Sequence, residues 1–176
     1  VANKVITIAG TNGKGSTVSF IESMLLSNSN KVGTFTSPHI LKYNERIKIN
    51  GKCIDDKTLL DVFDLLDNIR GDDTLTYFEF ATLTAFYIFS KSDIDVAVLE
   101  VGLGGRLDAT NIIDSDISII TSIGIDHTEY LGNTIDSIAL EKAGVMRPFK
   151  KCIFAQTNPP SVIYKYAKNK SVNLLV

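Results

Sequence analysis

The stretch VITIAGTNGKGS, residues 5–16, decides the fold of this chain. Five residues that are apolar or β-branched lead directly into a loop with three glycines and a lysine, a pattern typical of a buried strand that ends in a turn. From Ser16 to Ser27 apolar residues then recur at helical spacing, until a run of Ser and Asn residues breaks the pattern. The sequence therefore predicts a unit of strand, glycine-rich loop and helix.

The loop has the composition of a site for nucleotide phosphates. Its glycines let successive backbone N–H groups turn toward one anion, the start of the helix adds partial positive charge, and Lys14 can reach the outer phosphates. The loop departs from the common G-x-x-x-x-G-K-[ST] form, because Ile8 stands at the first glycine position. Gly15 also follows the lysine directly, so the hydroxyl comes one residue late, at Ser16. A glycine-rich turn without a ligand is the alternative, and phosphate binding is the better prediction.

Length and composition restrict the class of protein. The 176 residues suit one domain, and 44% hydrophobic with 22% charged residues excludes intrinsic disorder. No apolar run is long enough for a membrane span, and the first residues do not have the pattern of a secretory signal peptide. A net charge of −2 argues against general binding to nucleic acid or membranes. We expect a cytoplasmic protein with a small-molecule ligand, in which Cys53 and Cys152 are reduced and structural.

Strand and helix patterns alternate along the rest of the chain. Strands are expected at residues 5–9, 32–36, 95–101, 116–121 and 152–155 and at the end of the chain. Helices are expected at 16–27, from a cap at Asp55 or Asp56 to just before Gly71, and at 78–91, 135–145 and 161–168. The helix at 78–91 is apolar nearly all round, which places it deep in the fold. Residues 46–54 predict a small β-ribbon around Asn50-Gly51. The predicted fold class is α/β, P-loop-containing, with a mainly parallel sheet flanked by helices and a small β-ribbon insertion.

Several polar residues follow predicted strands, at the edge where open α/β sheets bind ligands. Glu100 ends an apolar strand, which fits a magnesium ligand beside the phosphates, although a charge that only emerges at a strand end is the alternative. Asp126-His127 also follows a strand, and an exposed loop histidine is the equally weighted alternative there. His39 is interpreted as an exposed loop histidine. Nothing in the pattern distinguishes Lys142 from a solvated helix lysine.

A second glycine-rich segment, Gly102-Leu103-Gly104-Gly105-Arg106-Leu107, is not a dinucleotide fingerprint. Leu107 stands in the place of the final glycine, and no clear helix follows. Its glycines fit a sharp exit of the chain from the sheet and a close approach to a ligand.

Six segments taken together resemble the ATP-binding domain of folylpolyglutamate synthases and dihydrofolate synthases, members of the Mur ligase superfamily of ATP-dependent amide ligases. The segments are Gly10-Thr11-Asn12-Gly13-Lys14-Gly15-Ser16, Thr36-Ser37-Pro38-His39 with Asn44-Glu45-Arg46-Ile47, Phe78-Glu79, residues 100–111, Asp126-His127-Thr128 and Glu141-Lys142-Ala143-Gly144. They follow the family's order, and the late hydroxyl of the phosphate loop is the family's own variant.

The resemblance implies a reaction and a set of site residues. ATP would phosphorylate a carboxylate of dihydropteroate or of a reduced folate such as tetrahydrofolate, and the amine of L-glutamate would displace phosphate from the acyl phosphate to form an amide. The residues implied for the ATP phosphates are Gly13, Lys14, Gly15 and Ser16. Those implied as Mg²⁺ ligands are Ser37, Glu100 and His127, and those implied in catalysis are Glu100, His127 and Lys142. An N-carboxylated Lys142 would help to place a second Mg²⁺.

The resemblance also implies a substrate site and a larger protein. The segments that match the lining of the dihydropteroate site are Thr76, Tyr77, Phe78 and Glu79, and Leu107, Asp108 and Ala109, where aromatic faces can stack on a pterin. Family members carry an N-terminal helix and a C-terminal domain, so we expect residues 1–176 to be most of an ATP-binding domain only, inactive by itself, from a monomeric enzyme. The alternatives are a Mur-type ligase for a nucleotide-linked cell-wall precursor and a P-loop regulatory ATPase, which the absence of an Asn-Lys-x-Asp motif disfavours.

Overall fold

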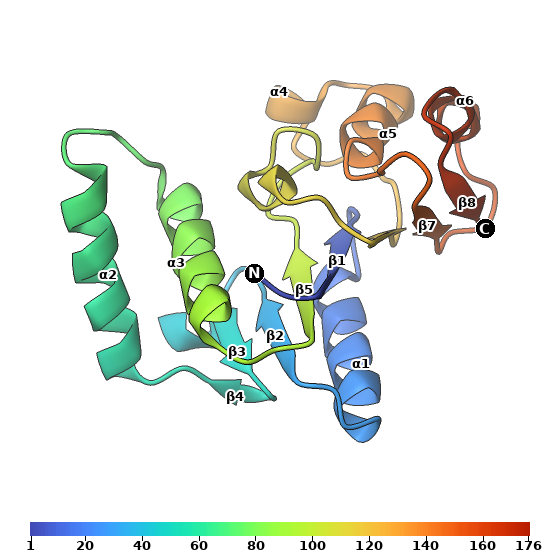
Figure 1. Ribbon diagram of the computed structural model, residues 1–176. Helices are drawn as coiled ribbons and strands as arrows, with labels where there is room; N and C mark the ends of the chain where they lie inside the picture. The colour runs from blue at the N-terminus through green and yellow to red at the C-terminus, as the bar shows by residue number, and fades with distance from the viewer.

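One eight-stranded sheet runs through the molecule (Figure 1). The structure is a computed structural model that describes residues 1–176. The strands are β1 (Lys4–Ala9), β2 (Val32–Phe35), β3 (Ile47–Ile49), β4 (Lys52–Cys53), β5 (Val96–Glu100), β6 (Ile117–Ile120), β7 (Lys151–Phe154) and β8 (Asn173–Leu175). They lie in the order β4-β3-β2-β5-β1-β6-β7-β8, and all neighbours are parallel except β2 with β3 and β3 with β4. The predicted mainly parallel α/β sheet is confirmed.

The helices also follow the prediction closely. They are α1 (Lys14–Ser27), α2 (Asp56–Arg70), α3 (Tyr77–Lys91), α4 (Thr128–Leu131), α5 (Ile135–Ala143) and α6 (Ser161–Asn169), with two 3-10 turns, η1 (Tyr43–Arg46) and η2 (Ala109–Ile112). The capping of α2 is as expected, because the Asp55 side chain accepts a hydrogen bond from Thr58 N. The single turns α4, η1 and η2 were not predicted, since one helical turn is too short to show an apolar period.

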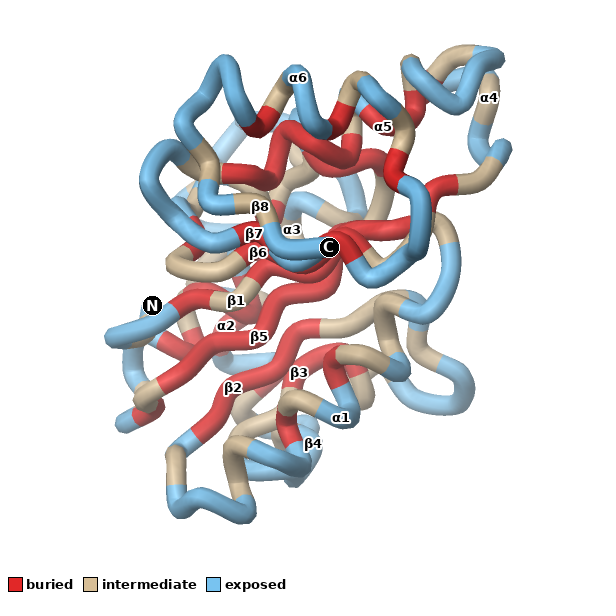
Figure 2. The backbone as a smooth tube through the Cα atoms, turned by 90° about the vertical axis from the view of Figure 1, so that its right-hand side faces the viewer, coloured by how far each residue is buried: buried red, intermediate tan, exposed pale blue.

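Both faces of the sheet are covered. Side chains from α3, α5 and α6 pack on one face, where Leu99 belongs to the cluster with α3 and Phe154 to the cluster with α5 and α6. The opposite face carries α1, whose Val18 packs against Ile8 and Val98. Figure 2 shows the central strands as the most buried part of the backbone. Every residue of β5 is buried, as its unbroken apolar run predicts for an inner parallel strand.

Two predicted features take a different form. We expected α3 to lie deep in the fold, but only one side of it is buried, and Tyr77 and Leu83 on its other side are exposed. The β-ribbon forms around Asn50-Gly51 as expected, and it extends the main sheet by pairing with β2. Asn50 and Gly51 have positive φ angles of 51° and 78°, as a tight hairpin turn requires.

The topology places four loops at one edge. Because β2, β5, β1 and β6 are adjacent and parallel, the segments that follow them emerge together at the carboxyl edge of the sheet. The glycine-rich loop, Ser37 and His127 lie in these segments, and Glu100 is the last residue of β5. None of the helices combines the length and the apolar character needed to cross a bilayer.

Candidate active site

The glycine-rich loop leads from β1 into α1 and is attached to the end of β6. Thr11 N donates to Ser122 O over 2.9 Å, and Lys14 Nζ donates to Gly10 O over 3.0 Å. Gly13 begins the helix with a φ of 83°, a left-handed conformation that favours glycine. No side chain caps α1 and its first turn has no acidic residue, so its first N–H groups can bind an anion. This geometry suits phosphate binding.

Glu100 lies beside the start of α1. It is only 4% exposed, and its Oε2 accepts a hydrogen bond from Ser37 N over 3.1 Å. A Cβ added to Gly15 would lie 3.6 Å from Oε2, so the carboxylate faces the helix start, where Ser16 is exposed. Burial raises the pKa of Glu100, and the Ser37 hydrogen bond and the charge of Lys14 partly oppose this shift.

The three expected Mg²⁺ ligands are only partly brought together. The carboxylate of Glu100 and the hydroxyl of Ser37 border one cavity, and such oxygens are ligands that Mg²⁺ prefers. His127 lines a different cavity, is about half exposed, and has a φ of 47°; its backbone N donates to Asp126 Oδ1 over 2.9 Å. Nowhere in the structure do three or more His, Cys, Asp or Glu side chains form a ready metal-binding cluster. The donor chemistry of Ser37 and Glu100 therefore fits Mg²⁺, and a role for His127 stays a prediction.

Lys142 is not the solvated helix lysine that its pattern indicated. It is 4% exposed near the end of α5, and its Nζ makes no hydrogen bond or ion pair. It lines a narrow cavity together with Lys14, Asp126 and His127. Burial lowers the pKa of Lys142 to about 8, with a further lowering by the charge of Lys14 and an opposing effect of Asp126. Part of this amine is therefore neutral at ordinary pH, which makes it a nucleophile.

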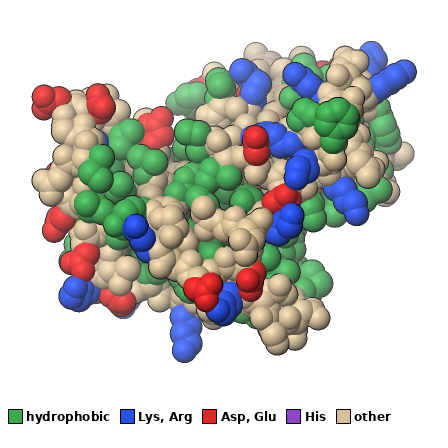
Figure 3. Space-filling model, in the orientation of Figure 1, with side chains coloured by type: hydrophobic (Ala, Val, Ile, Leu, Met, Phe, Trp, Pro, Cys, Tyr) green, Lys and Arg blue, Asp and Glu red, His purple; other side chains and the backbone are tan.

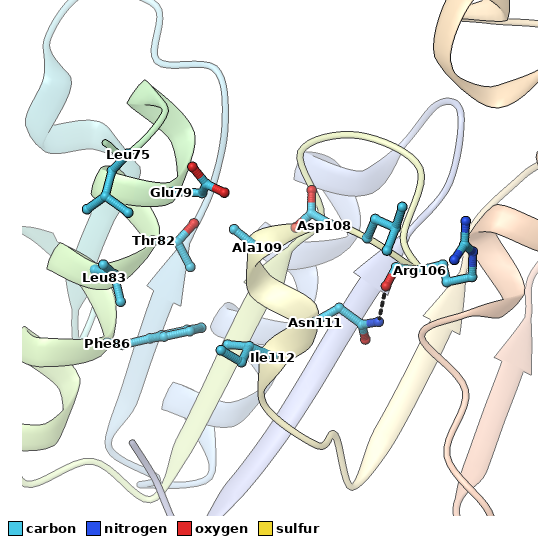
Figure 4. A pocket seen from close by; sticks show the side chains of 11 residues that line it. Leu75, Glu79, Thr82, Leu83, Phe86, Arg106, Asp108, Ala109, Asn111 and Ile112 are labelled. Carbon is cyan, nitrogen blue, oxygen red and sulfur yellow. Dashed lines mark hydrogen bonds between the residues drawn. The ribbon is translucent and has the colours of Figure 1, made fainter. Parts of the chain in front are cut away.

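The two segments expected to bind substrate meet across a pocket of about 420 Å³. Figure 4 shows Glu79 on α3 facing Asp108 and Ala109 at the start of η2, with Phe86 and Ile112 facing each other in the same lining. Leu107 belongs to the lining as well, and an adjoining pocket reaches Thr76 and Phe78. Figure 3 shows apolar side chains gathered over this part of the molecule. The surface suits a flat, largely apolar ligand.

Some residues of these segments also stabilise the local structure. Thr76 Oγ1 accepts from Glu79 N over 3.2 Å and Glu79 Oε2 accepts from Thr76 N over 2.7 Å, so the pair forms a capping box for α3. Phe78 packs on Phe35 with ring centroids 5.7 Å apart and presses against Gly102, where an added Cβ would lie 2.6 Å from the Phe78 ring. Tyr77, in contrast, is exposed.

Asp108 organises the second glycine-rich loop. Its Oδ2 accepts hydrogen bonds from Gly102 N and Leu103 N, both over 2.9 Å. Its Oδ1 accepts from Thr110 N over 2.9 Å and from Thr110 Oγ1 over 2.6 Å. With four donors on one carboxylate, Asp108 joins the end of β5 to η2 and fixes the wall of the pocket.

We expect Asp108→Ala to lower the free energy of unfolding by about 2–4 kcal/mol, because three backbone N–H groups and one hydroxyl lose a charged acceptor. Urea denaturation followed by circular dichroism measures this change. Asp64→Ala, an exposed position on α2, is the control and should stay within about 0.5 kcal/mol of the parent. Equal stability of the two variants would show that Asp108 has no structural role.

The hydrogen bond between Arg46 and His39, near Ser37, was not predicted from the sequence. His39 lies in a loop as expected, but it is partly buried instead of exposed, and its Nδ1 accepts a hydrogen bond from Arg46 Nε over 2.9 Å. Arg46 is itself buried between Tyr43 and Tyr77. Burial of an arginine depends on residues that are distant in the sequence, so the pattern held no signal for it.

The fold and the site define a mainly parallel α/β domain in which a glycine-rich loop, a buried carboxylate and a buried lysine lie near one another at the carboxyl edge of the sheet. The chain belongs to the Mur ligase family, because the model of the Mur ligase middle domain matches residues 8–176. It is similar to the dihydrofolate synthase/folylpolyglutamate synthase of Buchnera aphidicola subsp. Schizaphis graminum, with 49% identity over 168 residues that cover 96% of this chain and 40% of that protein. The Escherichia coli (strain K12) protein of the same name is 45% identical over 170 residues, covering 97% and 40%.

Solved structures give the same result. E. coli FolC in complex with DHPP and ADP superposes with a TM-score of 0.96 at 45% identity, over 98% of this chain and 42% of that one. A bifunctional folylpolyglutamate synthase/dihydrofolate synthase with Mn, AMPPNP and L-glutamate bound gives a TM-score of 0.94 at 46% identity, over 99% and 43%. The chain spans about 40% of the length of these curated relatives.

Proposed function

We propose that this chain is the ATP-binding domain of a ligase that adds L-glutamate to dihydropteroate, to reduced folates, or to both, through an acyl phosphate. The observation that carries this proposal is the convergence at one edge of the sheet. The phosphate loop, Glu100 with Ser37, and Lys142 lie there near the pocket that reaches Thr76 and Phe78, which adjoins the pocket between α3 and η2. The relatives that bind ADP or AMPPNP, Mn, DHPP and L-glutamate support the same ligand classes here.

The phosphate loop and the buried carboxylate would act on ATP. Backbone N–H groups at Gly13, Gly15 and Ser16 and the ammonium of Lys14 would hold the phosphates. Ser37 and Glu100, with His127 as the third ligand, would hold Mg²⁺, which neutralises phosphate charge during transfer. The carboxylate of the acceptor takes the γ-phosphoryl group and ADP leaves; the glutamate amine then attacks the carbonyl carbon and phosphate leaves with the former carboxylate oxygen.

N-carboxylation of Lys142 is the second part of the proposal. Its neutral amine would attack CO₂ and release a proton, which turns a buried cation into an anion. The pKa of about 8 supports this step, because a larger fraction of the amine is neutral than in an exposed lysine. The product would be attracted to Lys14 instead of repelled by it, and it could help to place a second Mg²⁺.

The acceptor would occupy the pocket between α3 and η2. Phe78 would offer an aromatic face to a pterin, with Tyr77 in the neighbouring groove beside Ser37, while Leu107 and Ala109 add apolar surface. Asp108 and the capping pair Thr76 and Glu79 would keep the walls in place. A cytoplasmic location, expected from the sequence, and a monomeric state, expected from the resemblance, are further predictions. Light scattering of the complete protein tests the monomeric state.

Product analysis with the complete protein tests this function. Reactions contain ATP, Mg²⁺ and L-glutamate with either dihydropteroate, tetrahydrofolate or a uridine-linked cell-wall precursor, and phosphate release and product mass are measured. We expect phosphate release that depends on an acceptor, and a mass increase of one glutamyl unit on at least one of the two pterin acceptors. Product from the uridine-linked compound alone would identify a cell-wall ligase, and ATP hydrolysis without any amide product would indicate a regulatory ATPase.

A further inference from the structure

Arg46, the last residue of η1, is a buried cation that the proposed chemistry does not use. It is 7% exposed, and its guanidinium carbon lies 5.5 Å from the ring centroid of Tyr43 and 5.2 Å from that of Tyr77. Its Nε donates to His39 Nδ1 over 2.9 Å, and its carbonyl oxygen accepts from Thr36 N over 2.9 Å. Side chain and backbone are therefore held in a defined position.

No carboxylate of the chain neutralises this arginine. Arg46 takes part in none of the ion pairs of the structure, and its two terminal nitrogens donate to no protein acceptor. The adjacent Glu45 carboxylate accepts instead from three backbone N–H groups in the preceding loop. The carboxylate of Asp108 is satisfied by its own four donors. A buried cation without a counter-ion is costly, and two aromatic rings offset only part of that cost.

Arg46 borders a groove that connects the two ends of the proposed site. The groove has a volume of about 350 Å³ and runs from Ser37 to Phe78 and Asp108. At one end it shares Ser37 with the cavity beside Glu100. At the other end it shares Phe78 and Asp108 with the pocket that reaches Thr76 and adjoins the pocket between α3 and η2. A ligand that reaches from the second pocket toward the phosphate site passes the unpaired guanidinium.

We propose that Arg46 binds a carboxylate of the acceptor substrate in this groove. The proposal rests on the proposed function and adds the subsite that would select an acidic acceptor. The planar guanidinium presents parallel N–H donors that match the two oxygens of a carboxylate. A carboxylate is favoured over a nucleotide phosphate as the occupant, because the groove opens into the apolar, aromatic pocket and the phosphate loop lies beyond Glu100.

Binding of an acid and its neutral analogue tests this assignment in the complete protein. Dissociation constants of pteroate and of pteroate carboxamide are measured by fluorescence for the parent, Arg46→Gln and Arg46→Lys. The KM for ATP is determined in parallel. Arg70→Gln, which removes a surface arginine paired with Asp67 on α2, is the matched control. Circular dichroism monitors the folding of each variant.

We expect Arg46→Gln to weaken pteroate binding by about 10- to 100-fold and to leave carboxamide binding and the KM for ATP unchanged. Arg46→Lys should lie between the parent and Arg46→Gln, and it decides the question if the Gln variant does not fold. Equal weakening of both ligands, no weakening of either, or a raised KM for ATP would overturn the assignment. If the parent binds neither pterin compound, the proposed function itself fails.

Discussion

Replacing Lys142 with methionine is expected to lower the rate of amide formation at least about 100-fold while the protein stays folded. The side chain is buried without a partner, so an apolar chain of similar length removes a desolvated charge and leaves the packing intact. Turnover in the complete protein measures the loss. Lys165→Met, at an exposed position of α6, is the control and should retain full activity.

The pH dependence of stability reveals whether Lys142 is carboxylated. An unmodified Lys142 has a pKa of about 8 when folded and about 10.5 when unfolded, so between these values the unfolded state binds more protons. An unmodified Lys142 therefore destabilises the fold most below pH 8. The free energy of unfolding rises by at most about 3 kcal/mol as the pH increases from 8 to 10.5. A carboxylated lysine lacks this dependence, as does Lys142→Met.

Comparison of the two pH profiles therefore separates the two chemical forms. Carboxylation predicts parallel profiles for the parent and Lys142→Met in the presence of bicarbonate, together with a carbamate signal in NMR spectra after addition of ¹³C-bicarbonate. Removal of CO₂ should lower the activity of the parent, and bicarbonate should restore it. A parent profile that rises between pH 8 and 10.5 in bicarbonate, with full activity, would contradict the modification.

Glu100→Gln is expected to lower activity by about 100- to 1,000-fold without loss of stability. The amide keeps an acceptor for Ser37 N, but it is a poor ligand for Mg²⁺ compared with a carboxylate. Because burial raises the pKa of Glu100, the ionised form is disfavoured in the folded state, and glutamine avoids that penalty. Turnover and Tm with and without Mg²⁺ and ATP are the measurements.

The raised pKa of Glu100 also determines whether Glu100→Gln stabilises or destabilises the protein. A carboxyl whose folded pKa is raised above 4.5 stabilises the fold fully only below pH 4.5, and this contribution is lost as pH rises through the folded value. At pH 7 without Mg²⁺ the Gln variant should therefore be at least as stable as the parent. With Mg²⁺ and ATP only the parent should gain Tm. Glu129→Gln, at an exposed position, is the control, and a Glu100→Gln protein that gains as much Tm as the parent would exclude Glu100 as a ligand.

Much of the fold could be predicted from local patterns. The run from Val5 to Ala9 and the glycines that follow it specify a strand, a loop and the start of α1, because side-chain periodicity and backbone freedom are properties of neighbouring residues. The Asp55 cap and the Asn50-Gly51 turn were predicted for the same reason. The single turns η1, η2 and α4 could not be predicted from the sequence, since their conformation depends on contacts with distant segments.

For the candidate site, too, some features could be predicted from the sequence and others depend on the tertiary structure. The sequence by itself determined the class of fold and the position of the glycine-rich loop, and through resemblance it predicted Glu100, Lys142 and the two pocket segments as site residues. Only the tertiary structure decided that Lys142 and Arg46 are buried without counter-ions and that Asp108 is held by four donors. Burial, pKa and hydrogen bonding depend on which residues approach through space, and the parallel order of β2, β5, β1 and β6 sets those neighbours.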